Sequence, residues 1–102
     1  MLKIGDKVRV RRLKDLVNEF GMKGGVRFDR SIECGQYANF IESMFKFCGG
    51  IYQVTRLNGQ YITLDGAGWY TYTTNMLEDP ETGAPVEAPE YDVEDYEPPL
   101  PF

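Results

Sequence analysis

The sequence predicts a mainly β protein in which a small barrel of antiparallel strands is followed by an acidic, proline-rich tail. Several short segments alternate between apolar and polar residues, and an Asn-Gly pair joins two of them. The composition also changes abruptly after Leu77. Residues 78–102 hold all 6 prolines and 9 of the 16 acidic residues, but no lysine or arginine. We therefore expect a barrel over residues 1–77, with a helical insertion at about 13–48, and a tail over residues 78–102.

The first segment alternates as a half-buried strand does. From Lys7 to Arg12 the sequence is KVRVRR, with valines on one face and basic side chains on the other. Apolar side chains then recur with the i, i+3, i+4, i+7 spacing of an amphipathic helix. Gly21 follows at the place where a residue with positive φ commonly ends a helix. We expect a strand over residues 7–12 and a short helix over residues 13–20.

The rest of the insertion combines a glycine-rich stretch with an apolar stripe. Residues 21–36 contain four glycines among charged side chains, which favours an irregular surface loop. From Gln36 to Cys48 a wide apolar stripe predicts a second helix, which Gly49-Gly50 would end. The stripe consists of Tyr37, Phe40, Ile41, Met44, Phe45 and Cys48.

The strongest local pattern is a hairpin. Residues 51–57 and 60–65 alternate on either side of Asn58-Gly59, and both central residues of a type I′ turn need positive φ. Residues 66–68 turn the chain again, residues 69–73 fit a third strand, and residues 75–77 fit a short helical turn that closes the domain. Short antiparallel strands favour a barrel because closure leaves no exposed edge.

The chemistry available to this chain argues against an enzyme. It contains no histidine, the most common general base and a very common metal ligand. Cys34 and Cys48 lack a CxxC spacing, and two thiols without histidine do not complete a tetrahedral metal site. We expect each to pack as a small apolar side chain. We expect no catalytic residue, no metal site and no cofactor.

The net charge of −5 conceals an uneven distribution. The first 77 residues carry 11 basic and 7 acidic side chains, a net charge of +4, whereas the tail has a net charge of −9. This segregation favours binding as the function. No apolar run reaches the length of a signal peptide or a membrane-spanning helix. We expect a soluble, cytoplasmic protein that does not bind membranes.

Three blocks of the sequence resemble a known group of proteins. KIGDKVRVRR opens the chain, FCGGIYQVTRLNG holds the first half of the hairpin, and GWYTYTTNMLE closes the domain. Over roughly residues 3–78 they resemble small, mostly uncharacterised Src-homology-3-like barrel proteins of bacteriophages and prophages. The Cys-Gly and Met-Leu-Glu motifs match, whereas Tyr70 and Tyr72, preceded by Trp69, replace a Trp-x-Trp pair. The resemblance implies a five-stranded Src-homology-3-like barrel in a bacterial host cell and assigns no function.

Aromatic side chains of the predicted strands are candidates for a partner-binding surface, because exposed rings recognise extended segments of other proteins. Alternation sends Trp69 and Tyr70 to opposite faces, so about half of the rings can point outward. Ordinary cross-strand packing is the alternative use of these residues. The candidates are Tyr52, Tyr61, Trp69, Tyr70 and Tyr72.

The tail has the composition of a disordered segment but also carries large apolar side chains. A tail that only solubilises the protein has no need of them. We expect the tail to bind a protein partner, or to dock on the chain's own basic strand or on a second copy. Its candidate contact residues are Tyr91, Asp92, Glu94, Asp95, Tyr96 and Phe102.

Together these patterns predict a non-enzymatic protein-interaction module, encoded by a phage or prophage, that uses barrel aromatics and the acidic tail. One alternative is an inhibitor of a host nucleic-acid-binding defence system, similar to an anti-CRISPR protein, whose tail carboxylates imitate a phosphate backbone. Another is direct nucleic-acid binding by the basic first strand, which the acidic overall charge disfavours. The side chains available for phosphate or tail contact are Lys7, Arg9, Arg11 and Arg12.

Overall fold

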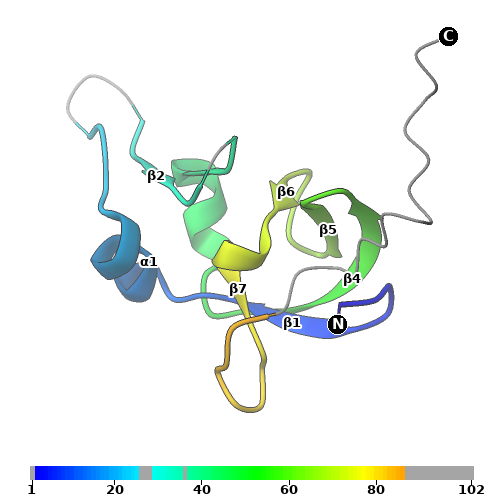
Figure 1. Cartoon of the computed structure of the whole chain (residues 1–102). Coiled ribbons are helices and arrows are strands. Elements are labelled where there is room, and N and C mark those ends of the chain that lie inside the picture. Colours follow the sequence, from blue (N-terminus) through cyan, green and yellow to red (C-terminus); the bar gives the residue numbers. More distant parts are fainter. Residues whose placement is uncertain (1, 26–28, 36, 87–102) are drawn as a thin grey trace, which may run out of the picture.

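Five antiparallel strands form the main sheet of the protein, and a two-stranded hairpin and short helices accompany it (Figure 1). The structure, a computed structural model, describes residues 2–25, 29–35 and 37–86. The elements are β1 (Lys7–Val10), α1 (Leu13–Phe20), β2 (Ser31–Glu33), β3 (Asn39–Ile41), the 3₁₀-helix η1 (Glu42–Phe47), β4 (Ile51–Asn58), β5 (Tyr61–Asp65), β6 (Thr71–Tyr72), the 3₁₀-helix η2 (Thr74–Met76) and β7 (Leu77–Glu78). The prediction of a mainly β protein is confirmed.

The strands of the main sheet are ordered β6-β5-β4-β1-β7, so β6 and β7 lie on opposite edges. Only residues 73–76 join these two edge strands. The edges of a flat five-stranded sheet are about 19 Å apart, at roughly 4.8 Å per strand. A connection that contains a 3₁₀ turn, with a rise of about 2 Å per residue, does not span that distance. The sheet is therefore strongly curled, although its edge strands do not pair with each other among the described residues.

The first strand and helix follow the sequence prediction closely. Val8 and Val10 are buried, whereas Lys7 is exposed, as the alternation requires. The strand ends at Val10, two residues earlier than expected, and α1 spans the predicted residues 13–20 with Leu16 buried. Gly21 ends the helix with a φ of +79°, and its N–H bonds to a carbonyl of the last turn.

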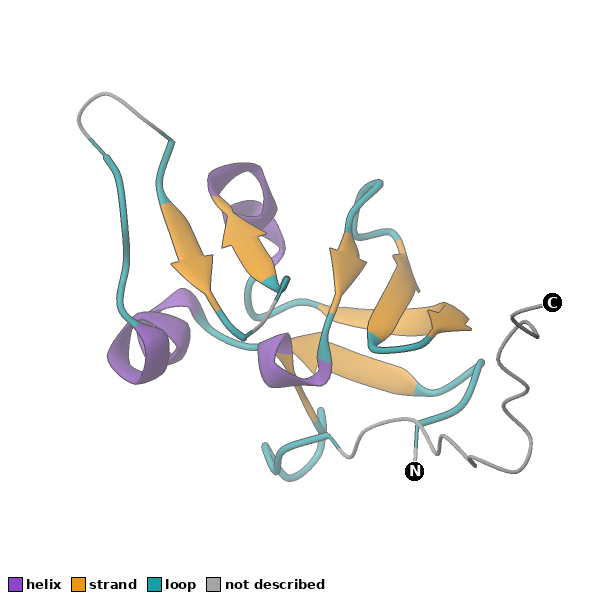
Figure 2. Cartoon of the chain, turned by 45° about the horizontal axis from the view of Figure 1, so that its top comes forward, coloured by secondary structure: helices purple, strands orange, loops and turns teal. Residues whose placement is uncertain are grey.

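The prediction for the rest of the insertion is wrong in two respects. Residues 31–33 and 39–41 form the β2–β3 hairpin, and the predicted helix over 36–48 is replaced by β3 and η1 (Figure 2). The apolar stripe satisfies a strand as well as a helix: Phe40 is fully buried between the exposed Asn39 and Ile41, which is a two-residue period. Tyr37, with a φ of +56°, also interrupts any helix that would begin at residue 36.

The predicted hairpin forms between β4 and β5, but its turn is shifted by one residue. Asn58 pairs with Tyr61, which leaves Gly59 and Gln60 as the central residues. Only Gly59, with a φ of +62°, has the positive φ that we expected at both Asn58 and Gly59. Positive φ at the first central position alone is the requirement of a type II′ turn rather than a type I′ turn.

The third strand is shorter than predicted. β6 contains only Thr71 and Tyr72, because the turn after β5 extends through Trp69. The predicted helical turn corresponds to η2, and β7 follows it across the expected boundary between barrel and tail. Buried side chains of the sheet, of α1 and of the β2–β3 hairpin form one hydrophobic core.

Candidate functional site

Three aromatic rings meet beside the turn between β5 and β6: Phe47 and Tyr52, which are close in sequence, and Tyr70 from the end of that turn. The Phe47 ring packs edge-on against Tyr52 at a centroid distance of 6.0 Å and lies tilted against Tyr70 at 6.3 Å. All three side chains are half-buried and pack against the core. The ammonium of Lys46 lies 5.3 Å from the centre of the Phe47 ring. Together with Trp69, which precedes Tyr70 in the sequence, we call these three rings the aromatic patch.

Two glycines make this packing possible. A Cβ atom at Gly50 would lie 2.4 Å from the hydroxyl oxygen of Tyr52, and one at Gly68 would lie 2.9 Å from two carbons of the Tyr70 ring. Gly68 also has a φ of +77°, which side-chain-bearing residues rarely adopt. The rings therefore lie directly on the backbone. Sequence reasoning identified the two tyrosines but missed Phe47, although adjacent glycines and aromatic residues were a usable signal.

Trp69 and Tyr72 differ in solvent exposure, although both were candidates for the partner-binding surface. Trp69 is 101% exposed in the turn, whereas Tyr72 is 0% exposed. The Tyr72 hydroxyl donates a hydrogen bond of 3.0 Å to the Ala67 carbonyl, and burial raises the pKa of this phenol above its ordinary value. Tyr72 is thus a core residue that offers no surface to a partner.

Tyr61, the fifth aromatic candidate, lies apart from the others on the solvent face of β5. It borders a groove of about 240 Å³ whose described lining residues include no carboxylate. Its hydroxyl donates a hydrogen bond of 3.2 Å to the Tyr37 carbonyl. The groove is lined by Arg56, Asn58, Tyr61, Thr63 and Thr71.

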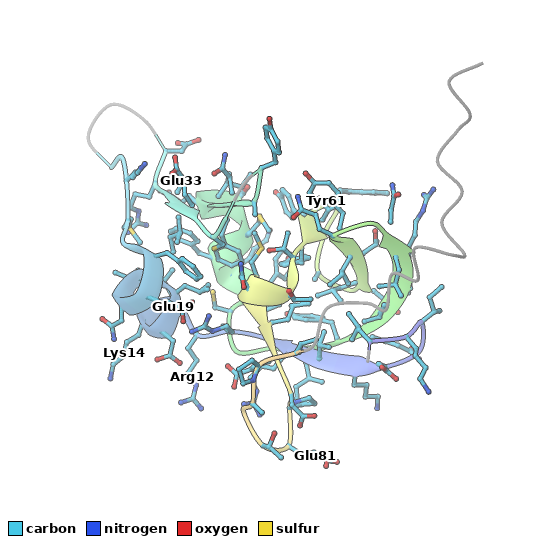
Figure 3. All side chains as sticks on the ribbon, in the orientation of Figure 1. Arg12, Lys14, Glu19, Glu33, Tyr61 and Glu81 are labelled. Carbon is cyan, nitrogen blue, oxygen red and sulfur yellow. The ribbon has the colours of Figure 1, made fainter. Side chains whose placement is uncertain are left out.

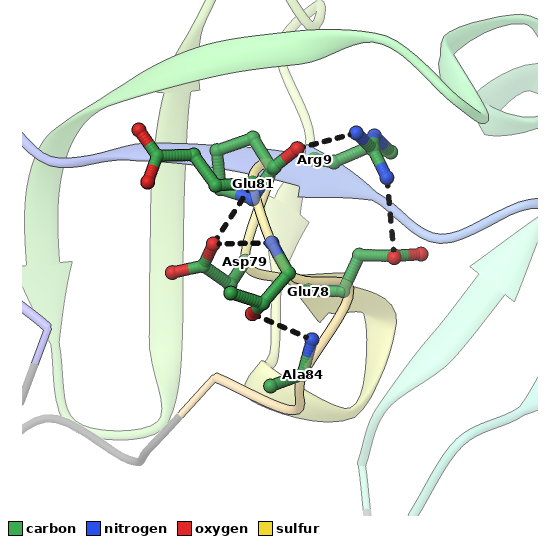
Figure 4. A network of polar contacts seen from close by, with 7 residues as sticks. Arg9, Glu78, Asp79, Glu81 and Ala84 are labelled. Atoms are coloured by element: carbon green, nitrogen blue, oxygen red, sulfur yellow. Dashed lines mark hydrogen bonds and ion pairs between the residues drawn. The ribbon is translucent and has the colours of Figure 1, made fainter.

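The arginines of the basic first strand are engaged within the molecule. Arg9 donates to a Glu78 carboxylate oxygen at 3.3 Å and to the Pro80 carbonyl at 2.6 Å (Figure 4). Arg11 bonds to the Asn75 carbonyl and to the Glu19 carboxylate, both at 3.0 Å. Both side chains hold later segments of the chain against this end of the sheet.

The other two basic candidates, Lys7 and Arg12, are exposed. Figure 3 shows Arg12 below α1, with its side chain pointing away from the ribbon. Lys7 borders a second groove, of about 620 Å³, between β1 and the loop over residues 79–86. The carboxylates of Asp6, Asp79 and Glu81 line that groove as well, so its charge does not favour an acidic segment. The structure therefore does not assemble the four basic candidates into one free surface.

Asp79 organises the loop that follows β7. Its Oδ1 atom accepts hydrogen bonds from the backbone N–H groups of Thr82, at 3.0 Å, and Glu81, at 2.8 Å (Figure 4). These bonds favour the carboxylate and hold the pKa of Asp79 below its ordinary value. Because folding lowers the pKa of Asp79, its ionised carboxylate stabilises the folded state at neutral pH. This stabilisation is lost as the pH falls through the pKa of the folded state.

Both cysteines are free, and neither has the environment of a reactive thiol. Cys34 is fully buried and Cys48 is half-buried, as expected of small apolar side chains. Burial raises the pKa of each thiol to about 11, so both are protonated at neutral pH. Within residues 2–25, 29–35 and 37–86, no group of three or more Cys, Asp or Glu side chains is placed to hold a metal ion.

The same described ranges contain no helix that is long and apolar enough to cross a membrane. The candidate residues of the tail, from Tyr91 to Phe102, lie outside the described residues. Comparison of the chain with protein-family models, with curated proteins and with solved structures found no match.

Proposed function

We propose that this protein is a non-enzymatic interaction module, encoded by a phage or prophage and active in the bacterial cytoplasm, that binds a protein partner through the aromatic patch. The observation that carries the proposal is the complete exposure of Trp69, which directly precedes Tyr70, one of three rings that are fixed by packing. Tryptophan and tyrosine are enriched among the residues that dominate binding energy at protein interfaces. Rings that are already ordered lose little conformational freedom on binding.

The architecture that we propose for this module is a small Src-homology-3-like barrel. The strand order and the four-residue connection between the edge strands support it, because together they require a strongly curled sheet. The shift in the β4–β5 register between Val54 and Arg56 supports it too, since bulges bend a sheet. An experimental structure in which β6 and β7 lie on opposite sides of an open, flat sheet would refute this part of the proposal.

The first residues of the tail, Glu78 and Pro80, contact Arg9 of the basic first strand. We further propose that the part of the acidic tail after Val86 contacts the partner rather than this strand. Arg9 and Arg11 already have partners, and the groove beside Lys7 is lined by three carboxylates. Inhibition of a defence system by imitation of a phosphate backbone stays a prediction from the sequence, because the acidic run over residues 81–97 that motivates it lies, apart from Glu81, outside the described residues.

The test is affinity capture from the bacterial host with four forms of the chain: the intact protein, Trp69→Ala, Ile4→Ala and a truncation after Val86. Ile4 is a matched control because it is also a large exposed apolar residue, at 64%. The truncation keeps Glu78 and Pro80, which bind Arg9. We expect Trp69→Ala to lose the partner that the intact chain and Ile4→Ala retain. Equal capture by Trp69→Ala and the intact chain would refute the role of the patch, and equal capture by the truncation would refute the role of the tail.

A further inference from the structure

The groove on the solvent face of β4, β5 and β6 shares no lining residue with the aromatic patch and has no role in the function proposed above. Its lining follows directly from the strand register. Thr63 pairs with Arg56 on one side and with Thr71 on the other, which places these three side chains in one row across the sheet. Asn58 and Tyr61 pair in the same way and form a second row. The sheet thus presents one cation, one amide and several hydroxyl groups together.

Arg56 stands on this face because β4 is irregular. The register shifts between Val54 and Arg56, so the alternation of side chains is reset at this point of the strand. Bulges of this kind commonly redirect a side chain beside a functional site. Arg56 is exposed, and its guanidinium makes no hydrogen bond or ion pair within the described part of the chain, in contrast to those of Arg9 and Arg11.

Tyr37, which is hydrogen-bonded through its carbonyl to the groove residue Tyr61, has an unusual backbone conformation. It is the one described non-glycine residue with positive φ, at +56°, and it is 79% exposed. Its carbonyl accepts the hydrogen bond from Tyr61, which borders the groove. The left-handed region costs a residue with a side chain conformational energy, and such strain occurs preferentially at functional sites. An exposed ring does not repay that cost by packing in the core.

From these observations we infer that the groove binds a nucleotide, either free or as part of a nucleic-acid single strand. The guanidinium of Arg56 matches a phosphate, with the Thr63 and Thr71 hydroxyls beside it, and none of the described lining residues has a carboxylate that would oppose an anion. The rings of Tyr37 and Tyr61 provide stacking surfaces for a base. Asn58 adds an amide that can hydrogen-bond to a base edge. This site differs from the basic first strand that the sequence suggested for nucleic acid.

Binding is tested on the full chain by fluorescence anisotropy with a short labelled oligothymidylate, with thymidine monophosphate and inorganic phosphate as competitors. We expect Arg56→Gln to weaken binding about 10-fold or more, because charge-assisted hydrogen bonds to the phosphate are lost. Lys14→Gln, which removes a positive charge from α1, is the matched control and should change binding less than about 2-fold. The slope of log K against log salt should also fall by about 0.7 in Arg56→Gln, the value for one phosphate contact on a single strand.

The Tyr37→Gly variant separates an effect on ligand binding from an effect on folding. Glycine relieves the strain at positive φ and removes the ring, so this variant should fold at least as stably as the natural chain and bind about 5-fold or more weakly. If the monophosphate competes as strongly as the unlabelled oligonucleotide, the ligand is a free nucleotide. If only the oligonucleotide competes, the ligand is a single strand. Arg12→Gln is measured as well, because Arg12 belongs to the basic first strand. The proposal would be overturned if inorganic phosphate competed equally, or if Arg56→Gln and Lys14→Gln weakened binding equally. It would also be overturned if only Arg12→Gln weakened binding, or if neither nucleotide probe bound.

Discussion

The turn between β5 and β6 and the strand that follows it contain the same kind of residue and use it in opposite ways. Trp69 in the turn is completely exposed, whereas Tyr72 in β6 is completely buried and hydrogen-bonded to the Ala67 carbonyl. The two residues are separated only by Tyr70 and Thr71. The turn that contains Gly66 and Gly68 delays the start of β6 and leaves Trp69 outside the sheet. Composition alone therefore does not decide whether an aromatic residue serves the core or a partner.

The largest effect on stability is expected at Tyr72, the buried residue of this comparison. Tyr72→Ala removes a fully buried ring and its hydrogen bond, and should lower the free energy of unfolding by about 4 kcal/mol. That is a large part of the total stability of a small domain. Urea unfolding followed by far-ultraviolet circular dichroism measures the change. A loss below about 1 kcal/mol would show that Tyr72 is not a core residue.

The second prediction concerns the turn that separates the two aromatic residues. Gly68→Ala introduces a Cβ atom at positive φ and against the Tyr70 ring, and should cost about 2 kcal/mol or more. Gly59→Ala is the matched control, since Gly59 also has positive φ but has no atom within 4 Å of the added Cβ. Gly59→Ala should lower the free energy of unfolding by about 1 kcal/mol, through backbone strain alone. Equal losses of unfolding free energy in the two variants would mean that the rings do not pack on Gly68.

A smaller effect isolates the hydroxyl of the buried residue. Tyr72→Phe leaves the ring in place and deprives the Ala67 carbonyl of its donor, which should cost about 1 kcal/mol. Tyr61→Phe removes a hydrogen bond that is exposed to water and should cost less than about 0.5 kcal/mol. If thermal denaturation shows the two variants to be equally stable, the Tyr72 hydroxyl does not contribute through a buried hydrogen bond.

The smallest effect on stability is expected at Trp69, the exposed residue of this comparison. Trp69→Ala should change the free energy of unfolding by less than about 0.5 kcal/mol, because the side chain is already in water in the folded state. Ile4→Ala should behave in the same way. Denaturant titration of both variants checks the prediction. A loss above about 1 kcal/mol in Trp69→Ala would place this residue in the fold and not in an interface.

Local patterns in the sequence predict much of the main sheet. Val8 and Val10 alternate as predicted, α1 has its predicted bounds, and the β4–β5 hairpin forms around Gly59. The β2–β3 hairpin was missed because an apolar stripe at helical spacing also contains a buried Phe40 between two exposed residues. Pairing with residues 31–33, which precede it in the same hairpin, selects the strand rather than the stripe itself.

The binding surfaces are less predictable than the fold, because they depend on contacts between distant residues. Trp69, Tyr70 and Tyr52 were candidates from their residue type, but Phe47 joins them only through tertiary packing. Arg9 appeared free in the sequence, yet Glu78 and Pro80 bind it from the far end of the domain. Arg56 is a lone cation in a predicted strand and was not among the candidate residues. Its place in a groove whose described lining has no carboxylate follows from a register shift.

The fluorescence of Trp69 in the presence of the captured partner tests the central claim most directly, because this is the only tryptophan of the chain. The free protein should emit as fully hydrated tryptophan does, and iodide should quench it as efficiently as a free tryptophan amide. With a partner that lacks tryptophan, or has it replaced, emission should shift to shorter wavelength and quenching should fall as the ring becomes buried. A complex that forms while both quantities stay unchanged would contradict the claim that the aromatic patch is the interface.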